Sequence, residues 1–221
     1  MDRVVLAVGA PRTVMSNEHE TGSAQGAARE RIGSILVAVM AFRQEPNRLL
    51  ARWLENKCWR YGSPEFPTDV ARNQTVNRFL AEDREFDHLL MIDADMVPLP
   101  DQPDGQRGTN AVFSEPGDIL YCGFVGAEGI RGHFGAADFG AACCRISRKV
   151  LESLPPPWFR FPTNAAGTVR TSCECTWFRA RVARRWPIRM AGIVGHLQPM
   201  VLVPTSEGPR AVSPLTVCDA R

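Results

Sequence analysis

Short, continuous runs of apolar residues recur along the chain and predict buried β-strands, because a strand covered on both faces lacks polar alternation. These runs are Val4–Val8, Ile35–Val39, Leu89–Ile92, Ile119–Phe124, Ala141–Ile146 and Ile188–Val194. Between them, apolar residues recur at helical spacing after Pro46, from Thr68 as N-cap, over 148–153 and over 175–185. Strands that alternate with helices predict an α/β fold with an open, mostly parallel sheet flanked by helices.

The segments between these elements are rich in proline and glycine. Residues 98–117 are expected to form a long surface loop, and a glycine-rich stretch covers 126–140. We expect a loose tail over 205–221. A chain of 221 residues is of the size of one large α/β domain, so we expect a single domain over 1–221.

Composition narrows the class of protein only a little. The formal net charge of +2 does not by itself predict a binder of nucleic acid or membrane. Only two of the 26 basic residues are lysines, which we read first as codon bias and second as a preference for phosphate ligands. Seven cysteines and a start without a signal-peptide pattern favour thiols in a reducing bacterial or phage-infected host cytoplasm. No apolar run reaches the ~20 residues of a membrane-spanning helix.

Two aspartates end the strand predicted at Leu89–Ile92. Asp93 and Asp95 follow four apolar residues directly, where loops of an open α/β sheet line the ligand crevice. Two carboxylates in such a place are costly unless they are paired, and a hard divalent cation would pair them while also binding a diphosphate. The alternative is a pair of surface turn residues, since an Asp-x-Asp sequence alone is not specific.

A series of motifs around these aspartates resembles, in order and spacing, the glycosyltransferase family 2-like enzymes with a GT-A fold, especially bacterial and phage members. The resemblance covers about residues 34–200. It rests on Ala71-Arg72-Asn73, Phe79-Leu80, Asp93-Ala94-Asp95, the segments 140–152 and 157–161, Ser172-Cys173-Glu174 with Trp177-Phe178-Arg179, and Gly195-His196. It implies a sugar-nucleotide half at about 1–100 and an acceptor half at about 118–200.

The resemblance also implies roles in binding the donor. Asp93 and Asp95, the second most directly, would hold Mn²⁺ or Mg²⁺ on the diphosphate of a nucleotide sugar such as a UDP-sugar, and His196 would complete the metal site. Arg72 and Asn73 would contact the nucleotide or stabilise the loop beneath it. Phe42 would stack near the base or fill the core. The first nucleotide-binding strand is either Val4–Val8 or Ile35–Val39.

In the acceptor half, Glu174 is the candidate general base of an inverting transfer, with Asp138 as the second candidate. The family usually has an acidic pair where this chain has Cys173 and Glu174. Trp158 and Phe159 would form a platform for a sugar ring or plug the core, and Gly140 lies in the segment that resembles the substrate site.

The acceptor is not specified by the motifs. A basic stretch favours DNA with a hydroxymethylated base: Arg179, Arg181, Arg184, Arg185 and Arg189. A polysaccharide, lipid-linked or protein acceptor remains an alternative, with the arginines as a solvated helix face. Two other classes also remain: a sugar nucleotidyltransferase with a phosphate loop at 6–13, and a non-enzymatic zinc or nucleic-acid module. The zinc module would use Cys143, Cys144, Cys173, Cys175 and His196.

Overall fold

A computed structural model describes residues 33–41, 45–65, 67–126, 129–131, 139–197, 201–205 and 208–212. The last two segments and residues 125, 126 and 129–131 are described by their backbone only. The helices are α1 (Arg48–Leu54), α2 (Thr68–Glu82), α3 (Ala111–Ser114), α4 (Arg148–Glu152) and α5 (Glu174–Val182). The strands are β1 (Ile35–Met40), β2 (Trp59–Tyr61), β3 (His88–Asp93), β4 (Met96–Pro98), β5 (Ile119–Gly126), β6 (Gly129–Arg131), β7 (Cys143–Ser147), β8 (Ile188–His196), β9 (Val201–Thr205) and β10 (Gly208–Val212).

The main sheet is mixed, with the strand order β2-β1-β3-β7-β5-β8-β4 and with β6 paired to β5. Five of its described strands (β1, β2, β3, β5 and β8) run in one direction, while β4, β6 and β7 run in the other. The expected α/β class is therefore confirmed, and the arrangement is consistent with a GT-A-like fold. The expectation of mostly parallel strands holds for strand direction. Neighbouring strands are nevertheless antiparallel in four described pairs of this sheet: β3–β7, β5–β7, β4–β8 and β5–β6.

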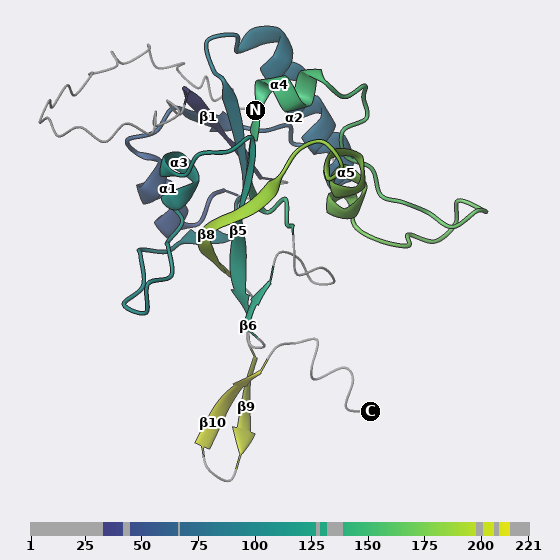
Figure 1. Cartoon of the computed structure of the whole chain (residues 1–221). Coiled ribbons are helices and arrows are strands. Elements are labelled where there is room, and N and C mark those ends of the chain that lie inside the picture. Colours follow the sequence, from purple (N-terminus) through teal and green to yellow (C-terminus); the bar gives the residue numbers. More distant parts are fainter. Residues whose placement is uncertain are drawn as a thin grey trace, which may run out of the picture. The chain divides into compact units, whose positions relative to one another are not determined.

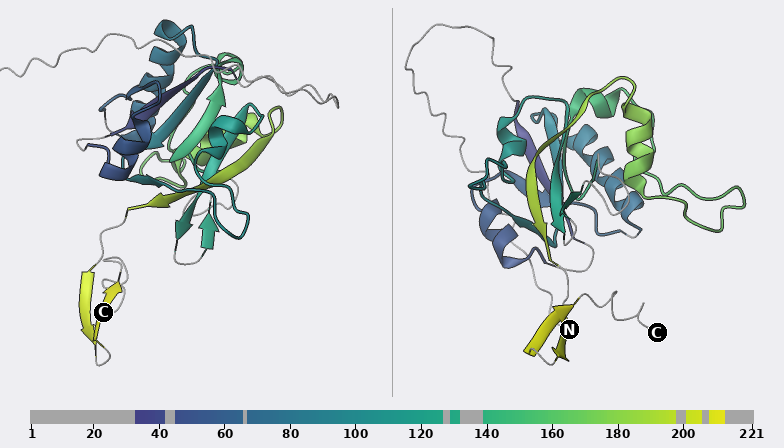
Figure 2. Two further views of the ribbon diagram at one scale, coloured as in Figure 1. Left: turned by 90° about the vertical axis from the view of Figure 1, so that its left-hand side faces the viewer. Right: turned by 60° about the horizontal axis from the view of Figure 1, so that its bottom comes forward.

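Helices cover both faces of this sheet, and alternate residues of β1 and β3 point to opposite faces. Leu36, Ala38, Leu89 and Met91 pack on one face with side chains of α2, α4 and α5. Val37, Val39, Leu90 and Ile92 pack on the other face with side chains of α1 and α3. Figure 1 shows these two groups of helices on either side of the strands, and Figure 2 shows the same layers in two further views. Burial on both faces explains the continuous apolar runs.

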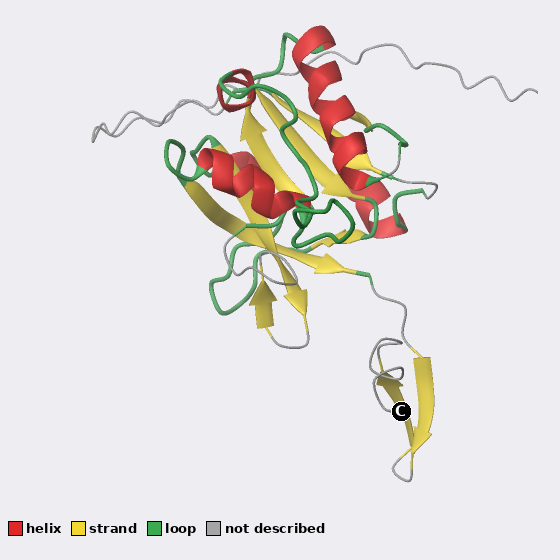
Figure 3. Cartoon of the chain, turned by 90° about the vertical axis from the view of Figure 1, so that its right-hand side faces the viewer, coloured by secondary structure: helices red, strands yellow, loops and turns green. Residues whose placement is uncertain are grey.

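The helix α2 is the longest described helix and begins one residue earlier than a Thr68 cap would require, since Pro67 is its N-cap. Its buried positions include Ala71, Val76 and Phe79, together with the charged residue Arg72. Figure 3 shows the helices of this face in front of the strands. Because Arg72 is buried, it can contact carboxylates from other segments of the chain at the candidate site.

Two segments differ from the sequence expectations. The predicted surface loop at 98–117 contains the short helix α3 and is fastened to β8, because the buried Thr109 hydroxyl donates to the Ile193 carbonyl at 2.8 Å. The predicted loose tail from 205 contains β10, which pairs with β9 in an antiparallel hairpin. The sequence left two candidates for the first nucleotide-binding strand. Val4–Val8 lies outside the described residues, and Ile35–Val39 forms most of β1.

Candidate active site

The candidate site lies at the edge of the sheet where β1, β3 and β8 end. Asp93 is the last residue of β3, and its backbone N–H donates to the Ala142 carbonyl at 2.8 Å. The chain then turns through Ala94 and Asp95 into β4, whose Met96 pairs with His196 at the end of β8. This topology brings residues that are a hundred positions apart in the sequence to one edge.

Arg72 joins the candidate metal aspartate to the candidate base. Its Nη2 lies 2.9 Å and 3.2 Å from the two carboxylate oxygens of Asp93. Its Nε lies 3.3 Å from Oε1 of Glu174, the first residue of α5. The Arg72 side chain is 2% exposed and that of Glu174 is 8% exposed. One buried guanidinium therefore contacts both carboxylates, Asp93 through Nη2 and Glu174 through Nε.

Asp95 and His196 form a second pair beside this network. Nε2 of His196 lies 3.1 Å from Oδ2 of Asp95, and Phe124 packs edge-on against the imidazole at 6.0 Å between ring centroids. The Asp95 side chain is 38% exposed, which is more than that of Asp93 at 28%. Asp95 is thus the more accessible aspartate, whereas both oxygens of Asp93 accept from Arg72.

The electrostatics of these groups reflect burial and close partners. Burial raises the pKa of Asp93 to about 6, with the nearby carboxylates of Asp95 and Glu174 adding to the rise and Arg72 opposing it. The hydrogen bond to Asp95 raises the pKa of His196 above its usual value. Without a cation, therefore, the protein itself tends to neutralise charge at this edge by binding protons.

The geometry of Asp95 and His196 fits a divalent cation. Two neighbouring ligands at ~2.1 Å from an octahedral cation lie about 3 Å apart, which is close to the separation of these two atoms. A set of one carboxylate and one imidazole suits Mn²⁺ better than Mg²⁺, which prefers oxygen ligands. Asp93 fits the role of a direct ligand less well, because Arg72 already engages its two oxygens.

Asn73 stabilises a loop by accepting and donating hydrogen bonds. Its Oδ1 accepts from the backbone N–H groups of Trp158 and Phe159 at 2.8 Å and 3.0 Å, and its Nδ2 donates to the Phe159 carbonyl at 2.7 Å. These contacts support the second role expected for Asn73, support of the loop at 157–161, whereas Arg72 bonds to Asp93 and Glu174. The same helix contributes Asp69, whose Oδ2 accepts from the Phe161 N–H at 3.3 Å.

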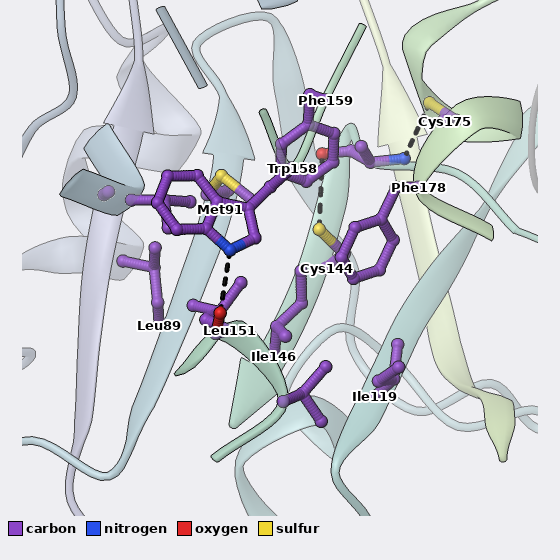
Figure 4. Close-up of a cluster of buried hydrophobic side chains, with 14 of the residues drawn as sticks. Leu89, Met91, Ile119, Cys144, Ile146, Leu151, Trp158, Phe159, Cys175 and Phe178 are labelled. Atoms are coloured by element: carbon purple, nitrogen blue, oxygen red, sulfur yellow. Dashed lines mark hydrogen bonds between the residues drawn. The ribbon is translucent and has the colours of Figure 1, made fainter. Parts of the chain in front are cut away.

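Trp158 and Phe159 are core residues in this structure, which corrects the interpretation of an exposed platform for a sugar. Phe159 is fully buried and stacks on Phe178 at 5.0 Å, and Trp158 is 4% exposed. The indole N–H of Trp158 donates to the Leu151 carbonyl at 2.8 Å (Figure 4). Side chains without accessible faces cannot stack on a ligand, so the other interpretation, a plug in the core, applies.

The remaining residues that the sequence predicted for the site either lie away from Asp95 and Glu174 along the chain or fall outside the described residues. Gly140 is buried, two residues before Ala142, whose carbonyl accepts from Asp93. Phe42, Asp138 and the predicted phosphate loop at 6–13 lie outside the described residues.

One residue of this site was missed by the sequence interpretation. Asn47 caps α1 through Oδ1, while its Nδ2 donates to the Ala94 carbonyl at 3.0 Å and the Met96 carbonyl at 2.7 Å. It therefore fastens the turn that carries Asp95 to the start of α1. Its position before a helical repeat indicates an N-cap, but its contacts with a turn 47 residues away have no local signal.

The five residues of the rival zinc module do not form one cluster. Cys143 and Cys144 are neighbours in β7 and point into different cores on opposite faces of the sheet. His196 contacts Asp95. Cys173 and Cys175 do lie close together, on either side of Glu174.

No protein-family model matches the chain, and no curated protein matches it. Among solved structures, the chain is similar to A197 from STIV, with 17% identity and a TM-score of 0.55 over 81% of this chain and 93% of that one. It also aligns with a glycosyltransferase involved in the glycosylation of the major capsid of PBCV-1, with 13% identity and a TM-score of 0.43 over 74% and 93% of the two chains. The first likeness shows the fold alone, and the second is too weak to support an argument about this chain.

Among the helices that the structure describes, none is both long enough and apolar enough to pass through a lipid bilayer.

Proposed function

We propose that this chain is a glycosyltransferase that moves a sugar from a nucleotide-sugar donor to an acceptor hydroxyl with inversion at the anomeric carbon. One observation carries the proposal: at one edge of a GT-A-like sheet, the pair Asp95–His196 adjoins a network in which Arg72 links Asp93 to Glu174. The site thus combines a cation-binding pair with a separate carboxylate, which are the two functions that a single-displacement transfer requires.

The donor side of the proposal assigns Asp95 and His196 to the cation. Mn²⁺ or Mg²⁺ held there would offset the negative charge that develops on the departing diphosphate. Asp93 and Arg72 would not bind the cation directly. Their contact would instead fix the position of the turn that carries Asp95. The resemblance of the motifs favours a UDP-sugar as the donor.

The acceptor side assigns the base to Glu174. Oε1 of this residue faces Arg72, so Oε2 is the oxygen that would take the proton of the acceptor hydroxyl as the hydroxyl attacks. Glu174 is only 6% exposed, so little water reaches its carboxylate. Such exclusion of water would protect the donor from hydrolysis.

We further propose a polyanionic acceptor, DNA with a hydroxymethylated base. The segment 160–172 joins Phe159 to α5 as a narrow two-stranded loop, with a bridge between Thr163 and Arg170, and projects beside α5 (Figure 1). This segment contains two arginines and neither aspartate nor glutamate. Narrow β-ribbons fit the major groove of DNA, and hydroxyl and arginine side chains bind phosphate.

The basic residues of α5 contribute unequally to such a surface. Arg181 is engaged with the loop, because its Nη2 donates to the Pro155 carbonyl at 2.6 Å and its Nη1 donates to the Pro157 carbonyl. Arg184 and Arg185, beyond the end of the helix, are exposed. These two arginines are therefore the candidates for contacts with phosphate.

A donor screen tests the reaction class. The protein is incubated with a panel of nucleotide sugars and a hydroxymethylated DNA duplex, with Mn²⁺ or with excess chelator, and the released nucleotide is identified. We expect a nucleoside diphosphate, released only with the cation. A parallel incubation supplies a nucleoside triphosphate and a sugar 1-phosphate, and release of inorganic diphosphate there would instead indicate a sugar nucleotidyltransferase. Turnover that is equal in chelator would contradict the proposed use of a cation.

A further inference from the structure

Three consecutive residues at the start of α5 place three metal-binding atoms close together. The thiol sulfurs of Cys173 and Cys175 and a carboxylate oxygen of Glu174 all lie within 4.8 Å of one another. Cys173 is the partly exposed N-cap residue of the helix, whereas Cys175 is 3% exposed. The group is therefore accessible from the side of Cys173 and closed on the side of the core.

Each of the three residues also has a polar partner behind it. The Ala141 backbone N–H donates to Sγ of Cys175 at 3.3 Å, as Figure 4 shows, and Oγ1 of Thr176 lies 3.4 Å from Sγ of Cys173. Arg72 Nε donates to Glu174 at 3.3 Å. Hydrogen bonds of this kind orient metal ligands and stabilise thiolate charge, so the surroundings resemble the outer partners of a metal site.

We propose that Cys173, Glu174 and Cys175 form a binding site for a thiophilic divalent cation of the Zn²⁺ class. In a tetrahedral zinc site with Zn–S bonds of ~2.3 Å, two sulfurs lie about 3.8 Å apart, which the observed cluster permits. Zn²⁺, two thiolates, one carboxylate and the guanidinium of Arg72 sum to zero charge. A water molecule would fill the fourth position.

Binding requires the loss of two protons. The hydrogen bond with Cys173 and burial raise the pKa of the Cys175 thiol, so the protein without a cation holds this thiol protonated. On binding, each sulfur gives an electron pair to the cation, and its proton passes to solvent. No atom is oxidised or reduced. The ligands also differ from those at Asp95 and His196, which offer one oxygen and one nitrogen atom and no thiolate.

The location of the site has a consequence that rests on the proposed function. A cation bound between the two cysteines takes an oxygen of Glu174 as its ligand, and this carboxylate then cannot accept a proton from an acceptor. Zn²⁺ would therefore inhibit the transfer that Mn²⁺ supports, and a chelator selective for zinc would restore it.

Binding is tested without any assay of activity. Co²⁺ serves as a probe, because its thiolate complexes absorb light, and Zn²⁺ affinity follows from displacement of the bound Co²⁺. We expect one thiolate-bound Co²⁺ per chain. Cys173→Ser, at a partly exposed position, should weaken Zn²⁺ binding by at least about tenfold. Cys58→Ser, which replaces an exposed cysteine far from the cluster in the sequence, is the matched control and should bind as the wild type does.

Several results would overturn the site. These are an absence of thiolate absorption, equal Zn²⁺ affinity in Cys173→Ser and the wild type, or an internal disulfide between the two cysteines in protein purified with a reductant. Circular dichroism shows whether each variant is folded, and Glu174→Gln provides a second variant that keeps both thiols and should also lose affinity. If Zn²⁺ binds as expected but no transferase activity is found, the metal site stands and the proposed function fails.

Discussion

At the scale of single residues, the chemistry depends on how buried charges are shared. The sequence predicted Asp93, Asp95, His196 and Glu174 as site residues, and the structure brings all four to one edge of the sheet. It could not predict that Arg72 would engage both Asp93 and Glu174, because neither contact is local. A guanidinium between two carboxylates is explained by the cost of burying either charge alone.

The first prediction concerns Glu174. Replacement by Gln keeps the size of the side chain but removes the group that takes the proton, so turnover should fall by ~10²–10⁴-fold. The KM for the donor should change little, since the proposed cation ligands remain. Steady-state kinetics and NMR of the product measure both effects, and the product should have the anomeric configuration opposite to that of the donor.

Glu152→Gln, at an exposed position of α4, is the control and should leave turnover unchanged. Turnover of the Glu174 variant close to that of the wild type would transfer the role of base to another acid. Retention of configuration would reject the single-displacement mechanism itself.

At the scale of elements, α2 connects the two halves of the molecule. The sequence predicted the existence and start of this helix from its apolar spacing. Arg72 and Asn73 were expected to contact the nucleotide or to stabilise the loop beneath it. Asn73 binds the loop before α5, and Arg72 binds the carboxylates of the site. Local patterns reveal which residues can form a helix, whereas the partners of its polar residues depend on packing between distant segments.

The second prediction tests this connection. Asn73→Ala removes three hydrogen bonds to the backbone of Trp158 and Phe159 and leaves buried groups without partners. The free energy of unfolding should fall by about 2–3 kcal/mol, measured by denaturation in urea. Hydrogen exchange should rise at 157–161. Asn77→Ala, at an exposed position of the same helix, should change stability by less than about 0.5 kcal/mol. Equal losses of stability in both variants would contradict the role of Asn73 in holding the loop at 157–161.

At the scale of the whole molecule, the α/β class followed from the alternation of apolar runs and helical repeats. The position of β7 between β3 and β5 did not, because a buried strand has the same composition in either direction. The pairing of β4 with β8 could not be predicted from the sequence either, although this pairing places His196 beside Asp95. Strand order is a property of long-range contacts, and short motifs do not encode it.

The third prediction concerns stability and pH. Burial, with Arg145 adding to its effect, lowers the pKa of His88 to about 4, while the unfolded chain binds this proton near its ordinary pKa of about 6.5. The unfolded state therefore binds more protons between these values, and this contribution to stability is lost as pH falls from about 6.5 to about 4. We expect a loss of about 1–3 kcal/mol.

Asp93 contributes with the opposite sign in part of this window, because its pKa is raised to about 6 in the folded state. The difference between the wild type and His88→Leu therefore isolates the histidine. Urea denaturation at a series of pH values should show the stability of the wild type falling relative to that of the variant as the pH decreases from about 6.5 to about 4. Parallel curves would mean that His88 does not titrate in this way.

The fourth prediction concerns the acceptor. If the acceptor is DNA, its affinity should fall steeply with salt, since each phosphate contact releases counterions. Arg184→Glu with Arg185→Glu should weaken DNA binding and lower the slope with salt while leaving nucleotide affinity unchanged. Charge reversal at Arg48 and Arg52 of α1 is the control. Activity that is insensitive to salt on a neutral acceptor, with none on modified DNA, would reject DNA.

The proposed cation site is tested most directly by a calorimetric titration with the nucleoside diphosphate that the donor screen identifies. We predict binding to the wild type with Mn²⁺, and a loss of at least about tenfold in affinity in excess chelator or in Asp95→Asn. Asp101→Asn, an exposed aspartate in the loop after β4, should bind as the wild type does. Equal affinity in chelator and in a folded Asp95→Asn protein would contradict the cation site on which the proposed function depends.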